Sequence, residues 1–461
     1  MRISRRAFIA RAGASAAGLI VAPYLKTASV FAGSHSAGSS SLAQVALTRA
    51  TSYDRVLVKQ RVQLLFDSLG GISDLMSAGK KVAIKLNLVG GSGSALSSKL
   101  GSRSVTESIW THPEIARAVG ELILDCGVNG NDIYFVESLW DSASYENFGY
   151  RNVQTYLGAQ MVNLNRRDPF PDFVDLPVGA NSYSFTSFRV NRILKDVDVF
   201  VSIPKMKEHY EAGVTASLKN QVGMVPKDLY TLPADSGRRG ALHSTAGGEP
   251  STTRLPRSIC DLAFARPVHL AVIDGIENAR GGEGVWNPTF RLAQDHVLIA
   301  GKEPVAADSV AAYLMGHDPE AATMALPAGG QCDNHLDLLH QKGVGTNQMA
   351  EIQAVGDGAD LVTSVVYQPY PAVPLGYDLC QNYPNPFNPM TTIRFSLPSE
   401  EYVTMRVVTA TGQVVELLVE GTLTAGIHEI RWMPEEIASG VYFCELRAGG
   451  FVDRRKMIYQ K

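Results

Sequence analysis

The residues best suited to bind or transform a ligand follow a short apolar run near the middle of the chain. Residues 197–203 are mostly apolar β-formers, and the run stops at Pro204. Lys205, Lys207 and His209 come next at alternate positions, so all three side chains point to one side if the strand conformation continues. Two ammonium groups and an imidazole on one side suit a phosphate or carboxylate ligand.

A second stretch adds polar side chains to the same region. Lys219 and Asn220 return within a short interval, in a segment where Gly213 and Gly223 permit close approach of the backbone. We expect them to converge with the three residues above on an anionic small molecule. The alternative that stays open is a solvated basic strand end without a ligand. We expect exposed charges, whose removal costs only about 0–1 kcal/mol of stability.

Two carboxylates are predicted to act as acid/base groups or as ligands of a metal whose identity the sequence leaves unknown. Asp274 follows the strand-like residues 269–273, and Glu283 lies in the glycine-rich residues 281–284. A carboxylate at the end of a parallel strand often serves catalysis or a metal. Asp274 also begins an Asp-Gly pair, so a turn-capping role stays open for it. Asp308 lies within an expected helix, where a structural role is favoured and a catalytic role stays open.

The elements that must position these residues alternate between strands and helices. Such alternation predicts an α/β domain over residues 45–356, with a mainly parallel sheet, covering helices and ligands bound where strands end. The expected strands are residues 81–89, 132–137, 197–203, 269–273 and 296–299, and the expected helices begin at Pro113 and Pro304.

Seven motifs in this body resemble a known family in their order and content. Together they are similar to the domain of unknown function numbered 362, and on this resemblance Lys85 and Asn87 join the ligand-binding candidates. The motifs are IKLNLV (84–89), THPE (111–114), PKMKEH (204–209), GVTASLKNQVG (213–223), DGIE (274–277), GGEG (281–284) and AGKEPVAAD (300–308).

The resemblance implies a cofactor that the cysteines of this chain do not match. Members of the family are often described as iron–sulfur proteins, and many carry a ferredoxin-like cysteine module. The five cysteines here are widely spread and none forms a C-x-x-C pair, which puts an iron–sulfur cluster in doubt and leaves the cofactor unknown. One disulfide remains possible in an oxidising compartment.

The last 80 residues carry patterns of their own. The motifs NYPNPFNP (382–389), ASGVYF (438–443) and RRKMI (454–458) resemble a type A sorting domain of the type IX secretion system, with an FlgD-type Ig-like fold. Apolar residues alternate with polar ones at 393–397 and 403–407, which predicts a small β-sandwich over 379–461. The resemblance implies type IX machinery as a partner. An Ig-like module without an export role is the alternative.

The N-terminal residues also resemble a targeting segment. Ser4-Arg5-Arg6-Ala7-Phe8-Ile9 resembles the twin-arginine export motif, and an Ala/Gly-rich apolar stretch and a cleavage site after Ala32 follow it. The resemblance implies twin-arginine export machinery as a partner for a signal peptide at 1–32. An ordinary Sec signal is the alternative. Either route takes the chain to the periplasm, and the tail then takes it to the cell surface or beyond. A proline-containing linker is expected at 357–378.

Composition narrows the function classes. The chain has 461 residues, 45% hydrophobic and 19% charged, with a net charge of −3, so it can bury at least two cores and is not expected to bind nucleic acid. Two functions stay open. One is an exported enzyme or cofactor-dependent protein that binds an anionic small molecule. The other is a non-catalytic surface module with a binding or structural role.

Overall fold

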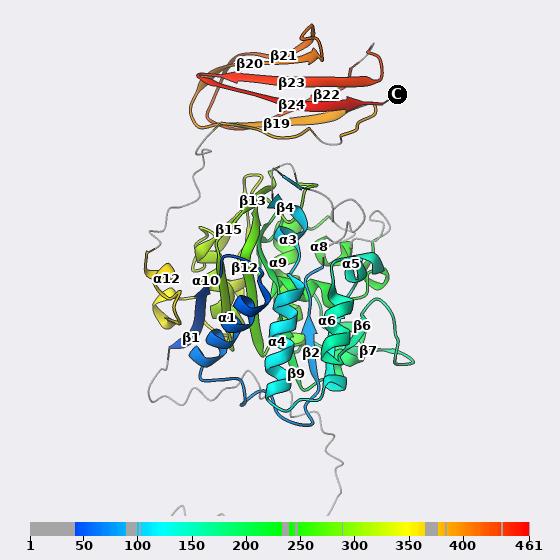
Figure 1. The fold of residues 1–461 in the computed structure, drawn as a ribbon, viewed down its shortest axis with the longest axis vertical. Helices are drawn as coiled ribbons and strands as arrows, with labels where there is room; N and C mark the ends of the chain where they lie inside the picture. Colours follow the sequence, from blue (N-terminus) through cyan, green and yellow to red (C-terminus); the bar gives the residue numbers. More distant parts are fainter. Residues whose placement is uncertain are drawn as a thin grey trace, which may run out of the picture. The chain divides into compact units, whose positions relative to one another are not determined.

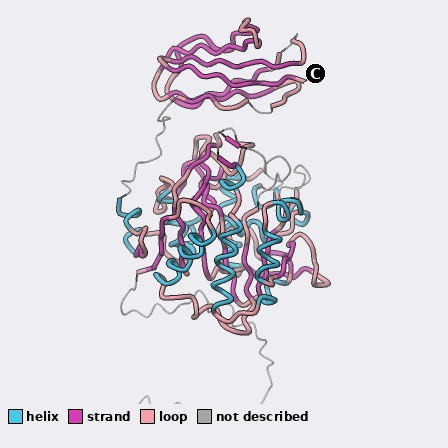
Figure 2. Tube along the Cα trace, viewed as in Figure 1, coloured by secondary structure: helices cyan, strands magenta, loops and turns pink. Residues whose placement is uncertain are grey.

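The computed structural model of the chain shows an α/β body and a C-terminal tail (Figures 1 and 2). The signal at 1–32 and the expected prolines of the linker, at 369–374, lie outside the described residues. The described residues are 42–88, 99–100, 103–232, 239–244, 248–287, 289–364, 377–382, 385–434 and 437–460.

A mixed sheet forms the centre of the body, in the order β17-β1-β14-β12-β9-β2-β5-β6. Only β14 runs antiparallel to its neighbours in this order, so the predicted α/β class with a mainly parallel sheet is confirmed. The strands are β17 (Ile352–Val355), β1 (Ala43–Arg49), β14 (Val297–Gly301), β12 (Leu270–Arg280), β9 (Val199–Ser202), β2 (Val82–Lys85), β5 (Ile133–Glu137) and β6 (Gln160–Asn163).

Helices cover both faces of this sheet. Figure 1 shows α1, α4 and α6 in front of it and α9 behind it. The apolar faces of the front helices pack on the sheet, with Val62 and Phe66 of α1 and Val119 of α4 in one buried cluster with Ile84 of β2. The helices are α1 (Arg55–Ser68), α4 (Pro113–Asp125), α6 (Tyr150–Leu157), α9 (Ser251–Ala265), α10 (Pro304–Leu314) and α11 (His335–Gln341).

Short elements at one end of the sheet carry most of the predicted site residues. β10 and β11 form a hairpin beyond β9, and β10 also pairs with the far part of β12. The sheet-end elements are β10 (Lys205–His209), β11 (Gly213–Thr215), the 3₁₀ helix η3 (Lys219–Met224), α3 (Val105–Ile109), β13 (Arg291–Ala293) and α8 (Gly240–His243).

The remaining elements of the body surround this framework. They are β3 (Lys99–Leu100), β4 (Arg103–Ser104), η2 (Gly130–Asp132), α5 (Ser142–Asn147), β7 (Phe173–Pro177), β8 (Ser187–Asn191), α7 (Ile193–Asp196), η4 (Asp228–Tyr230), β15 (Thr323–Ala325), β16 (Gln331–Asp333), η5 (Met349–Glu351) and α12 (Asp360–Ser364).

Two boundaries differ from the sequence prediction. β12 does not end at Ile273: it continues to Arg280, so Asp274 lies within a strand and not in an Asp-Gly turn. The strand continues because β10 and β13 supply hydrogen-bonding partners beyond the reach of β14. The body also extends past Gly356, since α12 follows and Asp360 pairs with Arg49 on β1 at 2.6 Å.

The tail is a β-sandwich, as predicted. One sheet has the order β18-β19-β22 and the other β21-β20-β23-β24, and Phe395, Met405 and Trp432 are among the side chains buried between them. The strands are β18 (Asp378–Leu379), β19 (Thr391–Leu397), β20 (Glu401–Thr409), β21 (Val414–Leu423), β22 (Gly426–Trp432), β23 (Gly440–Ala448) and β24 (Phe451–Tyr459).

Two further properties bear on the sequence analysis. All five cysteines are free thiols, so the disulfide left open above is not formed. Within the described residues, none of the helices has the length and apolar character needed to cross a membrane.

Candidate functional site

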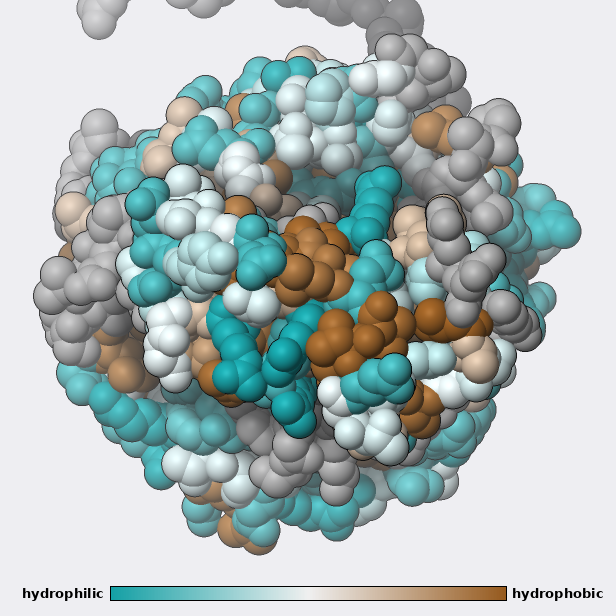
Figure 3. All heavy atoms as spheres, turned by 90° about the horizontal axis from the view of Figure 1, so that it is seen from above, coloured by the Kyte–Doolittle hydropathy of each residue, from teal (hydrophilic) through white to brown (hydrophobic). Residues whose placement is uncertain are grey.

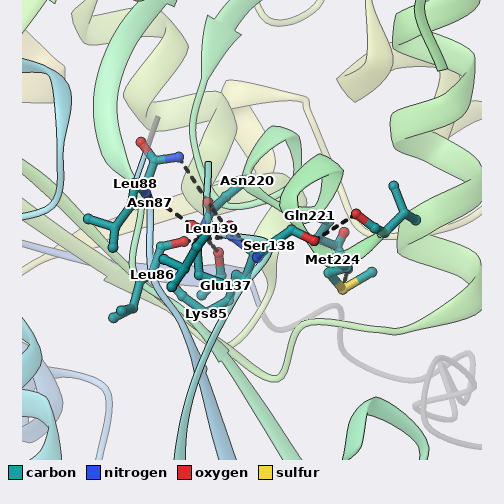
Figure 4. A network of polar contacts seen from close by, with 12 residues as sticks. Lys85, Leu86, Asn87, Leu88, Glu137, Ser138, Leu139, Asn220, Gln221 and Met224 are labelled. Atoms are coloured by element: carbon teal, nitrogen blue, oxygen red, sulfur yellow. Dashed lines mark hydrogen bonds and ion pairs between the residues drawn. The ribbon is translucent and has the colours of Figure 1, made fainter. Parts of the chain in front are cut away.

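A buried ion pair forms the floor of the site, where β2 and β5 end side by side. Lys85 Nζ donates to Glu137 Oε1 at 2.8 Å and to the Leu86 carbonyl at 2.7 Å. The other carboxylate oxygen of Glu137 accepts from the Leu88 amide at 3.0 Å. Burial lowers the pKa of Lys85, and the charge of Glu137 opposes that effect. Figure 4 shows this pair inside a wider polar network.

Two residues of η3, Asn220 and Gly223, pack against the ion pair of Lys85 and Glu137. Asn220 Oδ1 accepts from Asn87 Nδ2 at 2.9 Å and from Lys85 at 3.3 Å, while its amide nitrogen donates to Ser202 Oγ at 3.1 Å. A Cβ at Gly223 would lie 2.5 Å from both Lys85 Nζ and Glu137 Oε1, so only glycine lets the backbone come this close.

Asp308 holds the segment that leads into η3. Its carboxylate, fully buried on α10, accepts from the Ser217 amide at 2.8 Å, the Ser217 hydroxyl at 2.6 Å and the Leu218 amide at 2.8 Å. Burial raises the pKa of Asp308 to about 7 against the effect of these donors. The carboxylate thus has a structural role, positioning Lys219 and Asn220 from behind.

A small cavity of about 70 Å³ opens above this floor, and seven of the nine predicted site residues line it. It is larger than one water molecule and of a size for a small anion. Those seven are Lys85, Asn87, Lys207, His209, Lys219, Asn220 and Glu283, and the other lining residues are Leu88, Glu137, Ser138, Trp140, Thr215, Val222, Gly223 and Arg239.

Lys207 and Lys219 of the lining are buried, and within the described part of the chain no carboxylate oxygen lies within 4 Å of either amine. Lys207 Nζ donates to the Ile109 carbonyl at 2.5 Å, and for Lys219 no hydrogen bond is found within the described part of the chain. Burial lowers the pKa of Lys207 to about 7 and that of Lys219 to about 8; the charge of Glu283 opposes both shifts. Both amines can therefore change protonation near neutral pH.

His209 and Glu283 supply the remaining groups that can exchange protons. His209 Nδ1 accepts from the Glu211 amide at 3.1 Å, which assigns the proton of the neutral ring to Nε2. Burial, followed by the charges of Lys219 and His243, lowers the pKa of His209 well below its usual value. Glu283 is half-buried and accepts from the Tyr210 amide at 3.1 Å, which fixes its orientation.

Glu137 and Arg239 belong to the lining but were not predicted. Glu137 ends a predicted strand, so the rule applied to Asp274 would have found it. Arg239 lies in no recognisable motif, and its guanidinium reaches the lining by donating to the Ser138 and Val225 carbonyls at 3.1 Å each. Its backbone has a left-handed φ of 55°. Burial lowers the pKa of Arg239 to about 10.

Lys205 and Asp274 lie together in a separate cluster and not at the cavity. Lys205 Nζ donates to Asp274 Oδ2 and to Tyr53 Oη at 2.6 Å each, with both charged side chains fully buried. Tyr53 stacks on His112, with ring centroids 3.9 Å apart. The pairing of β10 with β12 shifts register between Lys205 and Lys207, which gives the two lysines different surroundings.

The expectation of exposed charges was wrong. Lys205 is fully buried and Lys219 is 9% exposed, because the end of β9 and the hairpin after it lie inside the body and not at its rim. Replacing them is therefore not nearly neutral for stability. For the metal role left open, no group of three or more His, Cys, Asp and Glu side chains among the described residues could hold an ion.

Comparison with solved structures gives only weak likenesses. CopC from Methylosinus trichosporium OB3b is 19% identical and covers 18% of this chain and 91% of its own, with a TM-score of 0.13. An engineered protein is 13% identical and covers 76% of this chain and 70% of its own, with a TM-score of 0.17. Scores this low carry no argument about fold or function.

Sequence comparison is more informative. The thylakoid-associated protein sll1697 of Synechocystis sp. is 26% identical over 277 residues, which make up 60% of this chain and 75% of that protein. Residues 381–460 match the secretion system C-terminal sorting domain, which indicates export toward the cell surface or extracellular space by the type IX machinery. Residues 82–313, half of the chain, match the domain of unknown function DUF362, and the chain therefore belongs to that family.

Proposed function

We propose that the α/β body binds a small phosphate- or carboxylate-bearing molecule in the cavity lined by Lys207 and Lys219. One observation carries this proposal: both lysines are buried, and neither has a carboxylate oxygen within 4 Å among the described residues. The other two buried lysines of the region, Lys85 and Lys205, each have such a partner.

The physical argument rests on the cost of an unpaired buried charge. An ammonium group removed from water loses several kcal/mol of hydration, and a nearby opposite charge must offset that loss. Lys85 and Arg239 bring the cations of the lining to four, whereas its described carboxylates are Glu137, which pairs with Lys85, and the half-buried Glu283. An anion bound here would supply the missing charge and raise the pKa of both lysines.

Proton transfer is the chemistry that the lining favours. Lys207, with a pKa of about 7, suits general acid–base catalysis near neutral pH, and Glu283 and His209 Nε2 offer further acceptor and donor positions. We include Glu283 in the proposed site and leave Asp274 and Lys205 out, because their charges already neutralise one another away from the cavity.

The test is a binding titration on the full mature chain. Inorganic phosphate and, separately, acetate are titrated calorimetrically into the wild-type protein, Lys207→Gln and Lys219→Gln. Removing one charged contact should weaken phosphate binding about tenfold or more, since hydrogen bonds to charged groups contribute about 1.5–3 kcal/mol. Lys59→Gln, which removes a lysine of α1 that pairs with Glu121 of α4, is the control and should bind like the wild type.

Two outcomes would count against the proposal. Equal affinities for wild type and both site variants would place the anion elsewhere. No binding by the folded wild-type protein would favour the alternative function, a non-catalytic surface module without a ligand.

We also propose that residues 1–32 form a twin-arginine signal that precedes export by the tail. Support comes from Arg5 and Arg6 with the weakly apolar stretch that follows. Changing both arginines to lysine should retain the precursor in the cytoplasm. Unchanged export of that variant would indicate the Sec route instead.

A further inference from the structure

The outer face of the four-stranded sheet in the tail carries several exposed apolar side chains. Val403, Met405 and Val407 of β20 point into the core, so the residues between them point outward with their cross-strand partners. Figure 3 shows hydrophobic patches interleaved with hydrophilic ones on the side of the molecule that it views. Five large apolar residues on this face are 40–58% exposed: Tyr402, Val414, Leu417, Val441 and Val452.

Three arginines and one carboxylate form a cluster on the same face, which we call the arginine cluster. Glu445, on β23, is fully buried, and its carboxylate lies between Arg406 of β20 and Arg454 of β24. Arg406 and Arg447 donate to Glu445 Oε1 at 2.6 and 2.9 Å, and Arg454 Nε donates to Oε2 at 2.5 Å. One carboxylate thus fixes three guanidinium groups that remain 34–56% exposed.

The charge of this face is positive. Lys456 points outward beside the arginine cluster, because its partner across the strands, Phe443, precedes the inward-facing Cys444. The face therefore has two carboxylates, those of Glu445 and the exposed Glu420, and four cations, those of Arg406, Arg447, Arg454 and Lys456. A second copy of the same face would bring like charges together, so self-association through it is disfavoured.

We propose that this face is the surface by which the tail docks on the secretion machinery, and that its partner is an acidic protein surface with apolar residues between its carboxylates. This inference rests on the match of the tail to the sorting domain. Arginine and tyrosine, together with tryptophan, are the residues enriched among those that dominate binding energy at interfaces, so Tyr402 and the arginine cluster are the expected anchors, and the valines and Leu417 add apolar area around them. Held in place by Glu445, the guanidinium groups lose little freedom when they bind carboxylates in bidentate fashion.

The experiment measures export of the full chain in a host with type IX machinery. Arg447→Gln with Arg454→Gln removes two positive charges and keeps hydrogen-bond donors near Glu445. Tyr402→Ser with Val452→Ser removes exposed apolar area and leaves the core unchanged. Each double variant should lower the exported fraction about tenfold, as expected for loss of interface anchors.

The matched controls lie on the other side of the sandwich. Arg431→Gln changes an exposed arginine of β22, and Met433→Ser changes a residue just beyond that strand that is 58% exposed. Both should be exported like the wild type. Limited proteolysis of the full chain reports whether each tail is folded, because a folded tail opens rarely and resists cleavage.

Several results would overturn the inference. One is normal export of both double variants. Another is an equal loss in the controls, which would indicate a general effect of surface changes. If Arg447→Gln with Arg454→Gln unfolds the tail, the exported fraction of Tyr402→Ser with Val452→Ser alone decides whether the inference holds. Sedimentation of the wild-type chain with phosphatidylglycerol vesicles, lost in the arginine variant, would replace the acidic protein partner by an anionic lipid surface.

Discussion

Replacing Lys219 by methionine should stabilise the α/β body at pH 7. Burial lowers the pKa of Lys219 from 10.5 to about 8, which corresponds to a cost of about 3 kcal/mol at neutral pH, where the unfolded chain holds its proton more tightly. Methionine has a similar length and no charge, and no hydrogen bond to a described residue is lost. We expect a gain of about 1–3 kcal/mol in the free energy of unfolding.

The stability that Lys219→Met gains over the wild type should fall as the pH rises. Because the folded-state pKa of Lys219 is lowered, the unfolded state binds more protons between pH 8 and 10.5, so wild-type stability rises with pH over that range. The variant lacks this dependence, and its advantage should shrink above pH 8 and vanish above about pH 10.5. Phosphate should stabilise the wild type as the logarithm of its concentration above Kd, and it should stabilise the variant less at the same concentration, because the variant binds phosphate more weakly.

Lys205→Met is the control, because Lys205 is a buried lysine that does have a carboxylate partner. It leaves Asp274 buried without its partner, so we expect a loss of about 3–5 kcal/mol. Urea unfolding followed by tryptophan fluorescence measures both variants, with the transition of the tail, which neither change touches, as an internal reference. Destabilisation of Lys219→Met by more than about 1 kcal/mol would refute the reasoning, because it would mean that Lys219 is favourably paired.

Three further predictions concern other parts of the chain. Gly223→Ala should destabilise the body by about 1–3 kcal/mol, since the new methyl group would lie 2.5 Å from Lys85 Nζ and Glu137 Oε1; a thermal melt against Gly450→Ala, where nothing lies within 4 Å, checks this. The tail should lose stability as pH falls from about 4.5 to 2: burial raises the pKa of Glu445, but three arginines outweigh it and hold the value at about 2. Stability is therefore present above the unfolded value and lost as pH falls through the folded value, and the rate at which pepsin cleaves the tail at each pH will show or refute this. Arg239→Gln should weaken phosphate binding at the cavity with little change in melting temperature; a large fall in melting temperature would instead give Arg239 a structural role.

Local patterns were enough to predict the architecture. Alternating strand and helix signals gave the α/β body, and period-two alternation in the tail gave the sandwich, because both depend on which face of each element is buried. The length of β12 was not predictable in this way. Its second half is a strand only because β10 and β13 arrive from other parts of the chain to pair with it.

The alternation of residues along a strand was not sufficient to predict which side chains of the candidate site lie together. Lys205, Lys207 and His209 follow the period of a strand, yet Lys205 lies with Asp274 and Tyr53 whereas Lys207 and His209 line the cavity. The register shift between Lys205 and Lys207 depends on the partner strand, and nothing in the sequence of β10 specifies it.

The same separation explains why Lys207 and Lys219 have no carboxylate within 4 Å among the residues that the structure describes. Several nearby carboxylates are engaged with other groups: Glu137 with Lys85, Asp274 with Lys205, Glu211 with His243, and Asp308 with the backbone before η3. Among the lining residues this leaves Glu283, which is oriented by the Tyr210 amide and lies beyond 4 Å of either lysine. A site that needed only stability would have placed a carboxylate against Lys207 or Lys219. The two buried amines, whose pKa values are lowered to about 7 and about 8, therefore support the proposal that an anion binds here.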